Sequence, residues 1–389
     1  MGTEVNEVLV DEELSAEGHA AGVEREDLNL AEGIKEPFDP ALIDVVTRTM
    51  TVDLLLARLR RGVLDLAPDF QRQAGVWGDV AQSRLIESLL LRIPVPNLYA
   101  AETGDEGWSI VDGIQRLTTI ARFVDPTLVP GMTPLRLRGL EYLSSYDGHF
   151  YADLPPSLRT RIAETELLVH LIRSGTPEPV KFNIFARINT GGLPLTSQEL
   201  RHALIPGPAR AYLTRLAHSK AFKSATNFSI KPDRMADREM VLRFVAFHLT
   251  DPRNYGRGDL NGFLRDAMMQ LNVAADDTKD AIEQDFSRAL QLARDVFGNQ
   301  AFRKRSATNA DRRLPINKAI FESLAVNLAK LDPSQAVLLK SRRKDFDQQF
   351  AALTQNERFL DSVSGGTGDV RKVRTRFSMV DELLGEAVA

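Results

Sequence analysis

The sequence contains no cysteine, and this absence removes several classes of chemistry at once. A chain without thiols forms no disulfide, no thiolate nucleophile, no iron–sulfur cluster and no cysteine-type zinc site. The phosphate-loop pattern GxxxxGK[ST] and the hydrolase patterns GxSxG and HExxH are missing as well. Carboxylates, amides, arginines and a few histidines are therefore the groups from which a functional site is built.

Histidine is scarce, with 6 residues in a chain of 389 and none after His248. A nuclease of the HNH type needs a histidine as general base and usually a second histidine as metal ligand close by. We therefore expect no HNH nuclease in the C-terminal part of this sequence.

Long apolar runs are also missing. The sequence is 43% apolar and 26% charged, which is typical of globular proteins. No apolar run approaches the roughly 20 residues that span a bilayer, and the first residues are acidic where a secretory signal is basic. These features predict a protein with no membrane partner that stays in the cytoplasm.

Charge is distributed unevenly along the chain. Residues 1–40 carry 12 acidic and 2 basic side chains, whereas residues 301–389 carry 16 basic and 11 acidic ones. Because residues 1–37 combine this acidity with few aromatics, we expect them to form a disordered tail. Opposite charges attract, so we also expect this tail to lie over the basic surface and compete there with nucleic acid.

The hydrophobic pattern divides the rest of the chain into two domains. Residues 38–205 mix helical spacing with short strands at 95–101, 107–111 and 167–172, and Thr51 is placed to cap a helix. From residue 206 to 389 every apolar period is near 3.6. The sequence predicts an α+β fold, with a small mixed sheet in the first domain and an all-helical second domain.

The stretch V-D-G-I-Q-R-L-T-T-I at 111–120 places Asp-Gly between a strand and a helix. The first N–H groups of such a helix lack partners and favour an anion. Gly113 permits close approach of a phosphate, the Arg116 fork suits phosphate oxygens, Gln115 is able to orient a water, and Asp112 is able to hold Mg²⁺. This pattern indicates a phosphate-binding turn, in which Asp112 holds Mg²⁺ or polarises a water, with Gln115 and Arg116 beside it. The alternative is that Asp112 caps the helix and Arg116 forms a surface ion pair.

Two further polar loops are candidate phosphate-binding segments. Gln71 and Arg72 stand in a loop between Phe70 and Trp77, and Asn189, Thr190 and Gly191 belong to an N-T-G-G turn between two helices. An ordinary packed loop and a helix C-cap are the alternatives. Thr196 with Glu199 predicts a capping box at the start of the second helix.

Taken together, these stretches resemble the DGQQR-motif family of bacterial defence proteins, the N-terminal domain of GmrSD-type and SspE-type restriction proteins. Asp112, Gly113, Gln115 and Arg116 match the motif, while Ile114 replaces its first glutamine. Gln71 and Arg72 match an upstream Q-R pair, and Asn189 to Gly192 match a downstream polar turn.

The resemblance implies a fold similar to ParB and sulfiredoxin, and a nucleotide-binding, often NTP-hydrolysing module that senses or gates nucleic-acid cleavage in phage defence. It also implies an NTP with Mg²⁺ as cofactor and Asp112, Gln115 and Arg116 as the catalytic residues. A partner nuclease or another defence-system subunit is implied with it. The loss of one polar group at Ile114 bears on hydrolysis more than on binding. Because the related proteins continue into an HNH nuclease, this chain resembles a shorter branch with a helical domain instead.

Three basic clusters follow in the C-terminal part, and we expect them to contact DNA. Such clusters neutralise phosphates along a strand, although a solvated helix face is the alternative. The expected contact residues are Arg303, Lys304, Arg305, Arg312, Arg313, Arg371, Lys372 and Arg374. Three interpretations stay open: an NTPase switch, a DNA-binding or partner-binding subunit without turnover, and a capped helix without ligand.

Overall fold

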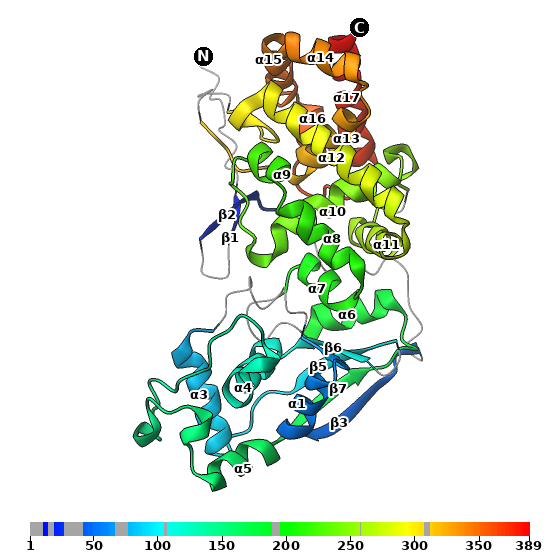
Figure 1. Cartoon of the computed structure of the whole chain (residues 1–389). Coiled ribbons are helices and arrows are strands. Elements are labelled where there is room, and N and C mark those ends of the chain that lie inside the picture. Colours follow the sequence, from blue (N-terminus) through cyan, green and yellow to red (C-terminus); the bar gives the residue numbers. More distant parts are fainter. Residues whose placement is uncertain are drawn as a thin grey trace, which may run out of the picture. The chain divides into compact units, whose positions relative to one another are not determined.

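The computed structural model describes residues 11–14, 19–26, 42–66, 77–104, 107–188, 195–256, 258–306 and 312–389. The chain forms two compact units (Figure 1). The sheet unit is Glu36–Pro206, and the helical unit is Gly207–Ala389 together with the described residues that precede Glu36. The predicted α+β class with an all-helical C-terminal part is confirmed.

The sheet unit is built around five strands in the order β3-β7-β5-β6-β4. The neighbours β5 and β6 are antiparallel, β5 and β7 parallel, β3 and β7 antiparallel, and β4 and β6 parallel. Its elements are β3 (Val45–Thr51), α1 (Val52–Arg60), β4 (Leu64–Asp65), α3 (Asp79–Leu90), β5 (Leu98–Thr103), β6 (Gly107–Asp112), α4 (Ile114–Val124), η3 (Pro126–Leu128), η4 (Ser144–Tyr146), η5 (Tyr151–Asp153), α5 (Pro156–Glu164), β7 (Glu166–Ile172), α6 (Glu178–Ile188) and α7 (Ser197–Leu204).

Helices α6 and α7 pack on the sheet through an apolar cluster that includes Ala101, Val111 and Ile172 from the strands and Phe185 and Leu200 from the helices. A polar bond fixes the same contact, because the Ser109 hydroxyl donates to the carbonyl oxygen of Ala203 at 2.7 Å. The predicted capping box at the start of α7 is confirmed, with Thr196 and Glu199 bonding each other's backbone N–H. These contacts tie both helices to the strand that ends at Asp112.

The helical unit contains two short strands and the remaining helices. These are β1 (Glu12–Leu14), β2 (Ala20–Glu24), α8 (Pro208–Ala217), α9 (Lys220–Ala225), η6 (Asp233–Met235), α10 (Ala236–Leu249), η7 (Pro252–Asn254), α11 (Leu260–Val273), α12 (Asp276–Phe297), η8 (Gly298–Gln300), α13 (Lys318–Ala329), α14 (Pro333–Ser341), α15 (Arg343–Leu353), α16 (Glu357–Ser362) and α17 (Val370–Val388).

The described N-terminal residues are part of this unit, so the prediction of a disordered tail is wrong for them. Strand β2 bonds the segment before α13, with Glu24 N–H donating to Ile316 O at 2.8 Å and Ile316 N–H to Gly22 O at 3.0 Å. Val23 is fully buried. Gly22 has φ +82°, and a Cβ there would lie 1.9 Å from the Ser229 carbonyl oxygen. Only glycine fits so close a contact.

Ion pairs explain why this acidic segment is ordered. Glu13 pairs with the buried Lys318 at 2.7 Å, and Glu24 pairs with the buried Lys304 at 2.6 Å. Glu24 also accepts a hydrogen bond from the Asn317 side chain at 2.9 Å. The acidic residues therefore neutralise buried cations of the helical unit instead of lying loosely over its surface.

A buried charge network continues this pattern around Arg243, which is fully buried on α10. Its guanidinium group contacts Glu26, Glu239 and Glu322, and Glu322 in turn pairs with Arg376. Burial by itself would lower the pKa of Arg243, but the three carboxylates outweigh it and raise the pKa. The arginine therefore stays charged and joins the N-terminal segment to three helices.

None of the helices in the described ranges is both long enough and apolar enough to cross a lipid bilayer.

Candidate functional site

The candidate site is the turn between β6 and α4. Strand β6 ends at Asp112, Gly113 takes a left-handed conformation with φ +91°, and α4 begins at Ile114. A Cβ on Gly113 would lie 2.2 Å from Leu98 Cδ2, so both the backbone angle and the space require glycine. The N-cap of α4 is Gly113, without a side-chain cap bond, so Asp112 is not the cap. The first N–H groups of α4 point past the end of the strand.

Asp112 and Arg116 form an ion pair one helical turn apart. Nη2 of Arg116 donates to Oδ2 of Asp112 at 2.9 Å, with 11% of the arginine side chain and 36% of the aspartate side chain exposed. The buried Nη1 of Arg116 has no hydrogen-bond partner among the described residues. A buried donor without a partner carries a desolvation cost of about 1–3 kcal/mol. An oxygen-rich anion at this turn would remove that cost.

The middle of the motif differs from its two ends. Ile114 is 3% exposed and belongs to the apolar core, so this position offers no polar group. Gln115 is half-buried, and its backbone carbonyl accepts a hydrogen bond from the Thr119 hydroxyl at 2.7 Å. The polar set at the turn is therefore Asp112, Gln115 and Arg116.

The other predicted phosphate-binding residues lie outside the described residues. These are Gln71, Arg72, Asn189, Thr190 and Gly191. Helix α6 ends at Ile188 and α7 starts at Ser197, so the two elements on either side of the N-T-G-G turn are described and both pack on the sheet. That these residues converge on Asp112 stays a prediction.

A magnesium site at this turn would depend on the nucleotide. No group of three or more histidine, aspartate or glutamate side chains able to hold a metal occurs in the described part of the chain. Mg²⁺ is commonly held by one or two carboxylates together with substrate phosphates and waters. Asp112 is a single carboxylate, so the turn fits a site of this kind, in which the ion is bound together with the nucleotide phosphates.

The pairing of the strands places two further polar residues near Asp112, and the sequence alone did not reveal them. Tyr99 of β5 lies opposite Asp112 of β6, and His170 of β7 lies opposite Tyr99. The His170 ring stacks on Tyr99 with centroids 4.8 Å apart, and its nitrogens contact Thr47 Oγ1 at 2.9 Å and Asn97 Nδ2 at 3.0 Å. These residues are scattered in the sequence, so only strand pairing identifies them.

Three of the residues expected to contact DNA, which are Arg303, Lys304 and Arg305, instead bind partners inside the helical unit. The prediction is wrong for these three. Arg303 is buried and bonds Leu314 O and Ser229 Oγ, and burial lowers its pKa to about 10. Lys304 is buried against Glu24. Arg305 pairs with Asp347 at 2.5 Å, and burial lowers its pKa. Buried and paired cations are not available to phosphates.

The remaining basic residues are more accessible. Arg312 and Arg313 are exposed, as are Arg371 and Arg374 on α17. Lys372 is half-buried, and its ammonium group contacts Asp361 at 2.9 Å. Of the residues expected to contact DNA, these exposed arginines are the most accessible, and the contact itself stays a prediction.

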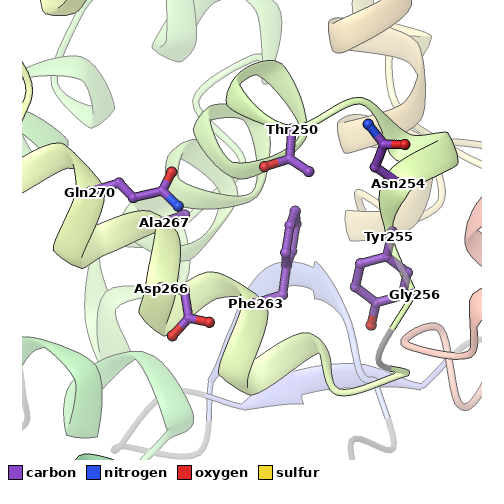
Figure 2. Close-up of a pocket in the computed structure, with 8 residues that line it drawn as sticks. All are labelled: Thr250, Asn254, Tyr255, Gly256, Phe263, Asp266, Ala267 and Gln270. Atoms are coloured by element: carbon purple, nitrogen blue, oxygen red, sulfur yellow. The ribbon is translucent and has the colours of Figure 1, made fainter.

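A separate pocket lies in the helical unit, between the end of α10, η7 and one side of α11 (Figure 2). It is lined by Thr250, Asn254, Tyr255, Gly256, Phe263, Asp266, Ala267 and Gln270. No sequence motif pointed to it, because its polar residues are of common types and follow no recognised spacing.

Comparison with known proteins agrees with the motif. Residues 53–206 match the family model of the GmrSD restriction endonuclease, N-terminal domain. The match starts in α1 and ends with the last residue of the sheet unit, so it contains the whole turn from Asp112 to Arg116. No curated protein and no solved structure matches the chain.

Proposed function

We propose, from the premise that residues 53–206 form a GmrSD-type N-terminal domain, that the sheet unit binds a nucleoside triphosphate at the Asp112–Arg116 turn. This match supports a role for the chain as a component of a restriction-type defence system against phage. Binding and hydrolysis of the nucleotide would act as a switch coupled to nucleic-acid sensing or cleavage. The proposal places this activity in the cytoplasm, with DNA and a nuclease or another defence subunit as partners.

The observation that carries the proposal is the unpartnered Nη1 of Arg116 beside an uncapped helix start. Phosphoryl transfer depends on positioned groups that neutralise the charge on the phosphate oxygens. Arg116 and the first N–H groups of α4 supply positive charge to those oxygens. Asp112 would hold the Mg²⁺ that accompanies the phosphates, and Gln115 would orient the attacking water.

One observation favours a second candidate function, which is nucleotide or DNA-phosphate binding without turnover. Ile114 stands where the family motif has a glutamine, and the structure buries it in the core. The site therefore has one polar group fewer for aligning a water, while the arginine and the helix start that bind phosphate are retained. Such a protein would act as a regulatory subunit that responds to ligand occupancy.

A phosphate-release panel separates these functions. ATP, GTP, CTP and UTP would be tested with Mg²⁺, with and without duplex DNA, on the wild type, on Arg116→Ala and on Arg84→Ala. Arg84 is the matched control because its pair with Glu141 is about half exposed on both sides and contributes little to stability. Turnover that Arg116→Ala abolishes and Arg84→Ala preserves supports the switch. Nucleotide binding without turnover supports the regulatory subunit, and no nucleotide response rejects the nucleotide site.

A further inference from the structure

The pocket in the helical unit combines an aromatic side with uncommitted polar groups. Its volume is about 170 Å³, and Figure 2 shows the Phe263 ring between Thr250, Gln270 and Asn254. The side chains of these three polar residues have no hydrogen-bond partner within the described ranges. Groups that offer donors and acceptors around a ring are suited to a planar molecule with a polar edge.

The aromatic side is held in place by the core. Phe263 packs on Tyr255 with centroids 5.1 Å apart and on Phe247 at 4.8 Å. Tyr255 is buried, and its hydroxyl donates to the carbonyl oxygen of Gly368 at 2.7 Å. A ring fixed on one side keeps its position when a ligand stacks beside it, so little conformational entropy is lost on binding.

Two arginines border the pocket. Arg253 immediately precedes the pocket residue Asn254, and 87% of its side chain is exposed, although it also pairs with Asp251. Arg374 of α17 donates from Nη2 to the carbonyl oxygen of Arg253 at 3.1 Å, and Arg374 is itself exposed. One of the C-terminal basic clusters that the sequence singled out is thereby placed next to the pocket.

We propose that this pocket binds one unpaired nucleobase of a nucleic-acid strand, with Arg374 and Arg253 contacting the adjacent phosphates. Proteins that bind single strands combine aromatic stacking with a basic surface along the backbone. The small volume admits one ring system, well below the space that a larger ligand needs. The proposal is independent of nucleotide binding in the sheet unit.

The carboxylate of Asp266 gives the pocket a preference among bases. A carboxylate only accepts hydrogen bonds, and here it already accepts from Arg265 at 3.1 and 3.2 Å. The exocyclic amino group of cytosine or adenine is able to donate to such an edge, whereas the donor of thymine, its ring N3–H, lies between two carbonyl oxygens that a carboxylate repels. The pocket is therefore expected to favour strands of dC or dA over strands of dT.

The test is fluorescence anisotropy on the full chain, without NTP, using short labelled single strands of dC, dA and dT and a blunt duplex. The test variant is Asn254→Ala with Gln270→Ala, both at exposed positions. Gln349→Ala, exposed on α15, is the matched control, and thermal unfolding checks that each variant folds. Loss of two neutral hydrogen bonds should weaken binding of the dC strand about tenfold, while the control stays at the wild-type value.

A second variant tests the phosphate contact. Arg374→Gln should weaken single-strand binding and flatten its dependence on salt, whereas Arg343→Gln, exposed on α15, should change neither. The proposal is overturned if single strands do not bind, if the duplex binds as tightly as the strands, or if the Asn254 and Gln270 variant keeps the wild-type affinity. Equal affinity for dC and dT strands would remove the role given to Asp266.

Discussion

Glu26 anchors the acidic N-terminal segment to the helical unit, and its removal gives a prediction of definite size. Its carboxylate is 6% exposed and contacts Arg243, which is fully buried, and the Thr367 hydroxyl at 2.6 Å. Breaking a buried ion pair by removing one partner costs about 3–5 kcal/mol. Arg243 keeps Glu239 and Glu322, so we expect Glu26→Ala to cost about 3 kcal/mol, at the low end of that range.

Chemical and thermal denaturation measure this loss. For a unit of this size, about 3 kcal/mol corresponds to a fall in melting temperature of roughly 6–12 °C. Asp11→Ala is the control because Asp11 is exposed and only its backbone carbonyl makes a bond, to Arg25 N–H. We expect that control to stay within about 0.5 kcal/mol of the wild type. If Glu26→Ala is as stable as Asp11→Ala, the segment is not part of the fold and the charge network is wrong.

Three further predictions concern the sheet unit. Burial works to raise the pKa of Glu87, but the backbone N–H groups of residues 141–143 outweigh it and lower the pKa. The ionised Glu87 therefore stabilises the fold above pH 4.5, and this contribution is lost as the pH falls through the lowered pKa. Glu87→Gln should cost about 2 kcal/mol at pH 7 and reduce that acid dependence, measured by denaturation at several pH values, and an unchanged pH profile would refute the assignment. Gly113→Ala should cost more than Gly62→Ala in the same denaturation assay, because both have positive φ but only Gly113 lacks space for a Cβ, and equal losses would contradict this. Ile114→Gln should lose about 1–3 kcal/mol without gaining turnover, since the amide would be buried; faster phosphate release at full stability would show that the position faces the ligand.

Local patterns were predictable from the sequence, and contacts between distant segments were not. The capping box at Thr196 and the turn at Gly113 depend on neighbours a few residues away, so the sequence shows them directly. Strand β3 was missed because most of its side chains are polar and exposed, which leaves no apolar alternation to detect. The order of the strands emerges only when they pair.

Charge was the least reliable guide. The sequence shows an acidic start and basic clusters near the end, and average charge density suggests a loose tail and an open basic surface. Individual pairs such as Glu24 with Lys304 bury the lysine and most of the glutamate across a separation of 280 residues. Composition does not encode such pairs, because the two partners are brought together only by folding.

The same limit applies to the candidate site. Asp112, Gly113 and Arg116 were identified because a strand, a glycine and a helix follow one another in the chain. Tyr99 and His170 lie beside this turn through sheet register, so no spacing rule would have found them. The geometry also adds the buried Nη1 of Arg116, which no sequence pattern reports.

Calorimetric binding of the preferred nucleoside triphosphate with Mg²⁺ to the wild type, Arg116→Ala and Arg116→Lys tests the central claim most directly. A lost charge-assisted hydrogen bond is worth about 1.5–3 kcal/mol, so Arg116→Ala should raise the Kd by roughly 10–150-fold. Arg116→Lys should recover part of this, because it restores the charge without the planar fork. A folded Arg116→Ala that binds the nucleotide as tightly as the wild type would contradict the proposed phosphate site at the turn.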